Sequence, residues 1–219
     1  MKTRNLLLLA LFITAALLQT ASWNVHAGTA TVNLSGTKQI IRCFGAASVW
    51  SGALDNSIMN TLFNTMGLRI LRVLIAPNEK GNNGNYFTWT DTLSNARRTK
   101  TRGAIVFATP RTPPASMKTN NNTVHGSLKS SSYSAYANYL KTFANYFKNN
   151  GASLHAISLQ NEPDWDPNYE GCTWTAAQFD MFIKNYGSVV SGAVKVIMPE
   201  SLNFNQAMSN TTLNDSAAA

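Results

Sequence analysis

The chain of 219 residues is 44% hydrophobic and 13% charged, and its 18 Lys and Arg against 10 Asp and Glu give a formal net charge of +8. This composition excludes a disordered acidic chain, a coiled coil and a collagen-like repeat, and it is typical of a globular chain that buries a core. The basic residues are scattered, whereas nucleic-acid binding concentrates Lys and Arg on one patch. We therefore expect no nucleic-acid partner.

The N-terminus has the pattern of an export signal. Two basic residues precede an apolar run over 6–18, which is followed by Gln19, Thr20 and small residues, and Ala27 is a small residue at the expected cleavage position. The run is too short to span a bilayer but typical of the core of a secretory signal peptide. The sequence predicts a signal peptide over 1–27, a secreted, extracellular chain over 28–219, and no membrane span.

Downstream of this leader, strand and helix patterns alternate along the chain. The predicted strands cover residues 42–47, 68–75, 104–108, 154–159 and 194–198. The predicted helices cover residues 54–66, 90–101, 133–147 and 179–186. Asp55 is a typical N-cap for the first helix, and Gly67 is a typical residue at its end.

This alternation, with nearly continuous apolar strands, predicts a parallel sheet covered on both faces. No G-x-G-x-x-G motif follows a strand, so the sequence does not support a dinucleotide-binding sheet. Long polar loops over 109–131 and 161–174 follow strands, at the face where (β/α)8 barrels build active sites. We predict an α/β fold, an incomplete (β/α)8 TIM barrel with about five of the eight βα units.

Acidic residues are concentrated directly after the predicted strand that ends at Leu159. Four of the ten acids lie there within nine residues, namely Glu162, Asp164, Asp166 and Glu170. Aromatic residues flank them, namely Trp165, Tyr169 and Trp174. The pattern fits a solvated turn-forming loop, and it equally fits a catalytic carboxylate with aromatic rings that stack on sugars.

Other chemistries find little support. The three histidines have no metal-ligand spacing, and the sequence contains neither a G-x-S-x-G elbow nor a phosphate-binding loop. We expect no metal and no cofactor. Cys43 and Cys172 lie 129 positions apart, and the sequence leaves open whether they pair.

Several motifs resemble a known family of enzymes. Gln160-Asn161-Glu162-Pro163 after an apolar strand is similar to the acid/base motif of the clan of retaining (β/α)8 glycosidases. The segments at 107–118, 157–164 and 198–201 resemble glycoside hydrolase family 30, and within it the bacterial glucuronoxylanase (endo-β-1,4-xylanase) subfamily. Two positions depart from this pattern, because Arg111 stands where close relatives have tryptophan and Cys43 replaces a glycine.

The resemblance implies a set of site residues. Glu162 corresponds to the general acid/base, which protonates the leaving oxygen and then deprotonates water. Arg72 corresponds to an arginine that supports the nucleophile. The implied substrate-binding residues are Asn161, Trp50, Trp174, Trp165 and Glu200.

The implied function is secreted cleavage of β-1,4-xylan (glucuronoxylan) by a retaining double displacement, with the polysaccharide as the partner. The family's nucleophile follows the seventh strand, so we expect this chain to be an N-terminal fragment that lacks it and does not hydrolyse xylan alone. Two alternatives are open: another family 30 β-glycosidase of the glucosylceramidase type, or a non-catalytic polysaccharide-binding remnant. The sequence indicates no oligomeric state.

Overall fold

The computed structural model describes residues 31, 33, 35–36, 40–77 and 89–218. The chain divides into two compact units, residues 1–40 and 41–219. The described part of the first unit contains a turn in which the Asn33 side chain accepts a hydrogen bond from the Ser35 N–H at 3.1 Å. The predicted signal peptide lies outside the described residues, and everything below concerns the second unit.

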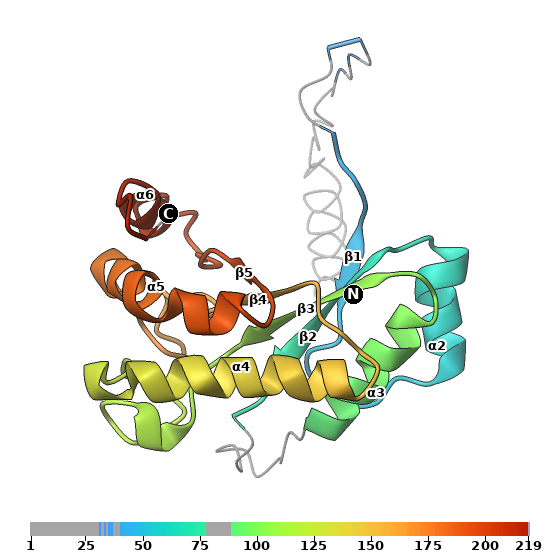
Figure 1. Ribbon diagram of the computed structural model, residues 1–219. Helices are drawn as coiled ribbons and strands as arrows, with labels where there is room; N and C mark the ends of the chain where they lie inside the picture. Colours follow the sequence, from blue (N-terminus) through green and yellow to red (C-terminus); the bar gives the residue numbers. More distant parts are fainter. Residues whose placement is uncertain (1–30, 32, 34, 37–39, 78–88, 219) are drawn as a thin grey trace, which may run out of the picture. The chain divides into compact units, whose positions relative to one another are not determined.

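The second unit is built on a parallel sheet of five strands in the order β1-β2-β3-β4-β5 (Figure 1). The strands are β1 Gly45–Ala47, β2 Ile70–Ile75, β3 Ile105–Pro110, β4 Ala156–Ser158 and β5 Lys195–Ile197. The spatial order equals the chain order without reversal, which is the winding of a (β/α) barrel rather than of a doubly wound sheet. The predicted α/β class and the position of every predicted strand are confirmed.

Helices connect the strands. They are α2 Asn56–Asn60, which the π-helical turn η1 Thr61–Thr65 continues, and α3 Trp89–Lys100, α4 Tyr133–Asn149, α5 Ala176–Ser191 and α6 Ala207–Leu213. The Asp55 carboxylate accepts a hydrogen bond from the Ile58 N–H at 2.8 Å, which confirms the predicted N-cap. Gly67 follows η1 with φ +71°, a conformation that favours glycine.

One face of the sheet packs against a layer of helices. The strand register aligns Val73, Ala108 and Ile157 across β2, β3 and β4, and all three are fully buried. Within the helix layer, Trp89 of α3 contacts α4, and Tyr133 of α4 contacts α5 with its ring centroid 5.7 Å from that of a phenylalanine. Aromatic side chains therefore join α3, α4 and α5 into one layer.

The opposite face is covered less completely than the sequence predicts. Side chains alternate between the faces of a strand, and the residues between the buried ones on β2 and β3 include Ile70, Arg72, Ile105 and Phe107. All four are only partly buried. The expectation of two covered faces is therefore met on the helix side alone. In a closed barrel this second face would line the interior.

Candidate active site at the carboxyl edge of the sheet

The carboxyl ends of the strands bring Glu162 between two neighbouring chain segments. On one side, the Asn161 N–H donates to the Pro110 carbonyl at the end of β3 at 2.9 Å. On the other side, the Glu162 N–H donates to the Glu200 carbonyl after β5, also at 2.9 Å. The loop after β4 is therefore fixed at its first residues, at the edge where barrels of this winding place their active sites.

A polar network joins side chains from four strand ends. Arg72 on β2 forms an ion pair with Glu200, with Nη2 and Oε2 2.7 Å apart. The same Nη2 donates to the Asn161 side-chain oxygen. Thr109 on β3 accepts from Arg72 Nε at 3.2 Å and donates to Glu200 Oε1 at 2.7 Å. Both carboxylate oxygens of Glu200 are thus occupied, and Arg72 orients Asn161.

Glu162 combines a constrained backbone with an open side chain. Its φ of +45° lies in the left-handed region, which non-glycine residues adopt at a cost and which is common at functional sites. Its carbonyl accepts a hydrogen bond from the Trp165 N–H at 3.1 Å. Its half-buried carboxylate accepts no hydrogen bond from another described residue. The group that an acid/base catalyst needs is therefore positioned but not engaged.

The other acids of this loop have structural partners. Asp164 accepts hydrogen bonds from the Ser201 hydroxyl at 2.6 Å and from the Leu202 N–H at 2.9 Å, which ties the loop after β4 to the loop after β5. Burial raises the pKa of the Asp164 carboxyl, but these hydrogen bonds outweigh it and hold the pKa below its ordinary value. Asp166 contacts His125 at 2.9 Å on the surface. The loop is therefore both turn-forming and close to the site.

The sequence did not indicate the part that Lys118 plays. Lys118 is fully buried, and its Nζ donates to the carbonyls of Thr123, at 2.9 Å, and Gly171. It joins the loop after β3 to the loop after β4. The residue belongs to one of the family-like segments, but a buried lysine cannot be recognised from local pattern because lysines are rarely buried.

The two cysteines are both free, which answers the question that the sequence left open. Burial raises the pKa of the Cys172 thiol to about 12, against the opposing effect of the Lys118 cation. Cys172 therefore stays protonated at neutral pH.

The aromatic candidates separate into exposed and buried rings. Trp50 is 49% exposed and Trp165 is 45% exposed, as sugar-stacking platforms need to be. Trp174 is only 5% exposed, and its ring lies 4.6 Å from that of Phe179 in the helix layer. The structure thus places Trp174 among core residues, and its role in lining a cleft stays a prediction. Because α5 is capped by the next residue, Thr175, Trp174 is directed into the core.

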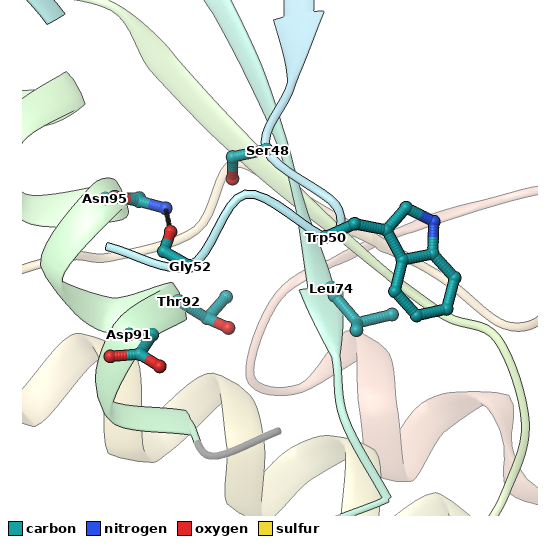
Figure 2. A pocket seen from close by; sticks show the side chains of 7 residues that line it. All are labelled: Ser48, Trp50, Gly52, Leu74, Asp91, Thr92 and Asn95. Carbon is teal, nitrogen blue, oxygen red and sulfur yellow. Dashed lines mark hydrogen bonds between the residues drawn. The ribbon is translucent and has the colours of Figure 1, made fainter. Parts of the chain in front are cut away.

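A small cavity of about 30 Å³ lies beside Trp50 (Figure 2). At its rim, the buried Asn95 side chain accepts from the Leu54 N–H at 2.8 Å and donates to the Gly52 carbonyl at 2.7 Å. Figure 2 shows the Trp50 ring pointing away from Asn95. The cavity has room for about one water molecule, which is too little for a sugar ring. The hydrogen bonds of Asn95 instead hold the loop that carries Trp50 in place.

Within the part of the chain that the structure describes, no group of three or more His, Cys, Asp or Glu side chains is placed to hold a metal ion. Over the same residues, no helix is long and apolar enough to cross a membrane.

A singly wound parallel β/α sheet, with an open glutamate, an arginine network and exposed aromatic rings at its carboxyl edge, is consistent with the class of (β/α)-barrel glycosidases. Residues 82–218 match O-Glycosyl hydrolase family 30, and the chain belongs to this family. The resemblance noted in the sequence is thereby confirmed.

Three relatives show how far the likeness extends. The chain is 37% identical over 203 residues to glucuronoxylanase XynC of Bacillus subtilis (strain 168), with 88% of this chain and 45% of that protein covered. The crystal structure of Xyn30A, a family 30 subfamily 8 xylanase from Clostridium acetobutylicum, is 59% identical with a TM-score of 0.78, over 85% of this chain and 49% of that one. A family 30 endoxylanase from Clostridium papyrosolvens C71 is 40% identical with a TM-score of 0.71 over the same shares. The chain therefore spans about half the length of these relatives.

Proposed function

We propose that this chain carries the acid/base part of a secreted glycoside hydrolase that cleaves β-1,4-xylan, and glucuronoxylan in particular, with retention of configuration. The observation that carries the proposal is Glu162, whose backbone is fixed at the end of β4 while its carboxylate accepts no hydrogen bond from the described residues. Similarity to enzymes named as xylanases supports the substrate class. The predicted leader over 1–27 supports export.

In this mechanism Glu162 protonates the glycosidic oxygen as the bond to the leaving sugar breaks. It then removes a proton from the water that releases the second product. Asn161 assists through its amide. Because Arg72 donates to the Asn161 side-chain oxygen, the amide Nδ2 is left to donate to a sugar hydroxyl. Such a contact stabilises the oxocarbenium-like transition state most when it is made to the 2-hydroxyl.

A retaining enzyme also needs a nucleophilic carboxylate about 5–5.5 Å from the acid/base. Two later acids of the chain are already engaged, since Glu200 is paired with Arg72 and Asp215 with Lys184, at 2.7 and 2.9 Å. Neither carboxylate is free in this arrangement, so the proposal takes the nucleophile from outside the described residues. Glu200 then acts by holding Arg72 and Asn161 in place.

The direct test is hydrolysis of glucuronoxylan by the protein as its gene expresses it, measured as new reducing ends. We expect Glu162→Gln to lower kcat by about 10²- to 10⁴-fold, the usual contribution of general acid–base catalysis. Asp166→Asn is the matched control, because it removes one charge from the same loop at an exposed position. Its activity should stay within about twofold of the parent, since exposed ion pairs contribute little.

A second measurement separates an acid/base residue from a merely structural one. In Glu162→Ala, added azide should restore turnover of an aryl β-xyloside with a good leaving group, because azide attacks the glycosyl-enzyme without needing a base. The product should be the β-glycosyl azide. Equal losses in the Glu162 and Asp166 variants would contradict the assignment. Xylan binding without any hydrolysis by the parent protein would favour the non-catalytic alternative.

A further inference from the structure

Arg111 lies between two aromatic rings at the edge of the candidate site. Its guanidinium carbon is 4.4 Å from the centre of the Trp50 ring and 4.6 Å from the centre of the Tyr169 ring. Both distances are within the range of cation–π interaction. The three side chains, which we call the Arg111 stack, come from the loops after β1, β3 and β4. They bring together parts of the chain that are 61 and 58 residues apart.

The Arg111 stack lies next to Glu162. Arg111 directly follows β3, and its carbonyl accepts a hydrogen bond from Gln160 Nε2 at 2.6 Å. The preceding carbonyl, of Pro110, accepts from the Asn161 N–H. The backbone at Arg111 is thus attached to the two residues that precede Glu162, and its guanidinium is close enough to Glu162 to interact with that charge.

Burial and neighbouring groups act in opposite directions on the charge of Arg111. Burial lowers the pKa of the Arg111 guanidinium, and Tyr169, Glu170 and Glu162 act in the opposite direction. Two carboxylates are therefore close enough to stabilise its charge, and an arginine stays protonated in a protein. A further anion brought to this position would meet those carboxylates as well as the guanidinium.

The guanidinium nevertheless keeps hydrogen-bonding capacity. Its Nε is buried and has no hydrogen-bond partner among the described residues, while the residue as a whole is only partly buried. The donors that a ligand can reach are therefore those on the exposed part of the guanidinium. The guanidinium also covers one face of each ring, so a sugar cannot stack on those two faces. What this position offers is a flat group with N–H donors, held in place by the rings above and below it.

We propose that Arg111 is a specificity-determining residue, which binds an uncharged sugar unit through its N–H donors beside Glu162. This inference deepens the proposed function and depends on it in one respect, namely that the site binds a polysaccharide. It differs from a simple electrostatic contribution, because it requires the planar guanidinium and not the charge alone.

The test compares Arg111→Gln with Arg111→Lys in the full chain, by calorimetric titration with xylotetraose and with the same oligosaccharide bearing one glucuronate, at 50 and 300 mM salt. Lysine keeps the charge but not the planar fork. We expect both variants to lose about tenfold in affinity for both ligands, the usual cost of one hydrogen bond to a charged group, with little effect of salt. Arg97→Gln, an exposed arginine of α3, is the control and should leave the affinities unchanged.

Two results would overturn the inference. In the first, Arg111→Lys keeps the affinity for the acidic ligand, Arg111→Gln loses it, and the affinity falls steeply with salt. Arg111 would then act by its charge. The other is unchanged affinity in both variants.

Failure of the proposed function would give different titration results. If the parent binds neutral gluco-oligosaccharides and not xylotetraose, the xylan proposal fails, and the Arg111 variants are then compared on the ligand that binds. If the parent binds none of these oligosaccharides, both proposals are wrong.

Discussion

The two halves of the loop after β4 have similar composition and opposite environments. The first half, residues 161–166, holds acids and Trp165, which is 45% exposed. The second half, residues 170–174, also holds an acid and a tryptophan, yet Glu170 is 9% exposed and Trp174 is 5% exposed. The first half lies along the edge of the sheet. The second is enclosed between the loop after β3 and the start of α5, so the surroundings, and not the residue types, decide which half is open to a substrate.

The largest expected effect comes from comparing the two tryptophans. Trp174→Ala should lower the free energy of unfolding by about 3–5 kcal/mol, because it opens a cavity among Tyr133, Phe179 and Phe182. Trp165→Ala should change it by less than about 0.5 kcal/mol, as exposed substitutions usually do. Urea unfolding followed by circular dichroism measures both. Equal effects of the two substitutions would show that the two halves of the loop do not differ in the way described.

A smaller effect is expected at the contact that encloses the second half. Lys118→Met keeps the length of the side chain and removes the donor to the Thr123 and Gly171 carbonyls. The Thr123 carbonyl keeps the hydrogen bond from the Gly171 N–H, but the Gly171 carbonyl loses its partner. Leaving that buried acceptor unpaired should cost about 1–3 kcal/mol. Lys129→Met is the control, since Lys129 also donates to a carbonyl, at 3.1 Å, in a solvent-exposed hydrogen bond of a residue that is only partly buried.

Hydrogen exchange locates the Lys118 effect. The amides of Gly171 and Thr173, which donate to carbonyls of the loop after β3 at 3.1 and 3.0 Å, should exchange faster in Lys118→Met. The amide of Asn161 in the first half should not change. Faster exchange throughout the loop would mean that its two halves open together.

The first half of the loop should show a small, pH-dependent effect through Asp164. Its carboxyl has a pKa below the ordinary value in the folded protein. The carboxylate therefore stabilises the folded protein at pH values above its pKa in the unfolded chain. This contribution is lost as the pH falls through its pKa in the folded protein. Asp164→Asn should lower the melting temperature by a few degrees at pH 7, and the difference should shrink as the pH falls below 4. A difference that is the same at all pH values would contradict this.

The smallest perturbation is chemical labelling of the two thiols. Cys43 is partly exposed, whereas Cys172 is buried with a thiol pKa of about 12. Iodoacetamide should therefore label Cys43 in the folded protein and Cys172 only after unfolding, because the thiolate is the reactive form. Mass spectrometry of the labelled peptides distinguishes the two. Rapid labelling of Cys172 in the folded chain would show that the second half of the loop is open.

The features that could be predicted were local or periodic. The strand pattern of β2 and β3, the N-cap at Asp55 and the stop at Gly67 depend on neighbouring residues, and the structure reproduces them. The motif around Glu162 indicated the family and the edge of the sheet. The burial of Trp174 could not be predicted, because the same aromatic residue type serves in a cleft or in a core.

By itself, the sequence determined the alternation of strands and helices and the position of the acidic loop, since both follow from short-range periodicity and from a compact motif. Only the tertiary structure decided which side chains meet. Arg72 and Glu200 are separated by 128 positions, and Arg111 reaches Trp50 and Tyr169 from a third segment. Such contacts arise because parallel strands place their carboxyl ends along one edge, and that proximity does not depend on distance along the chain.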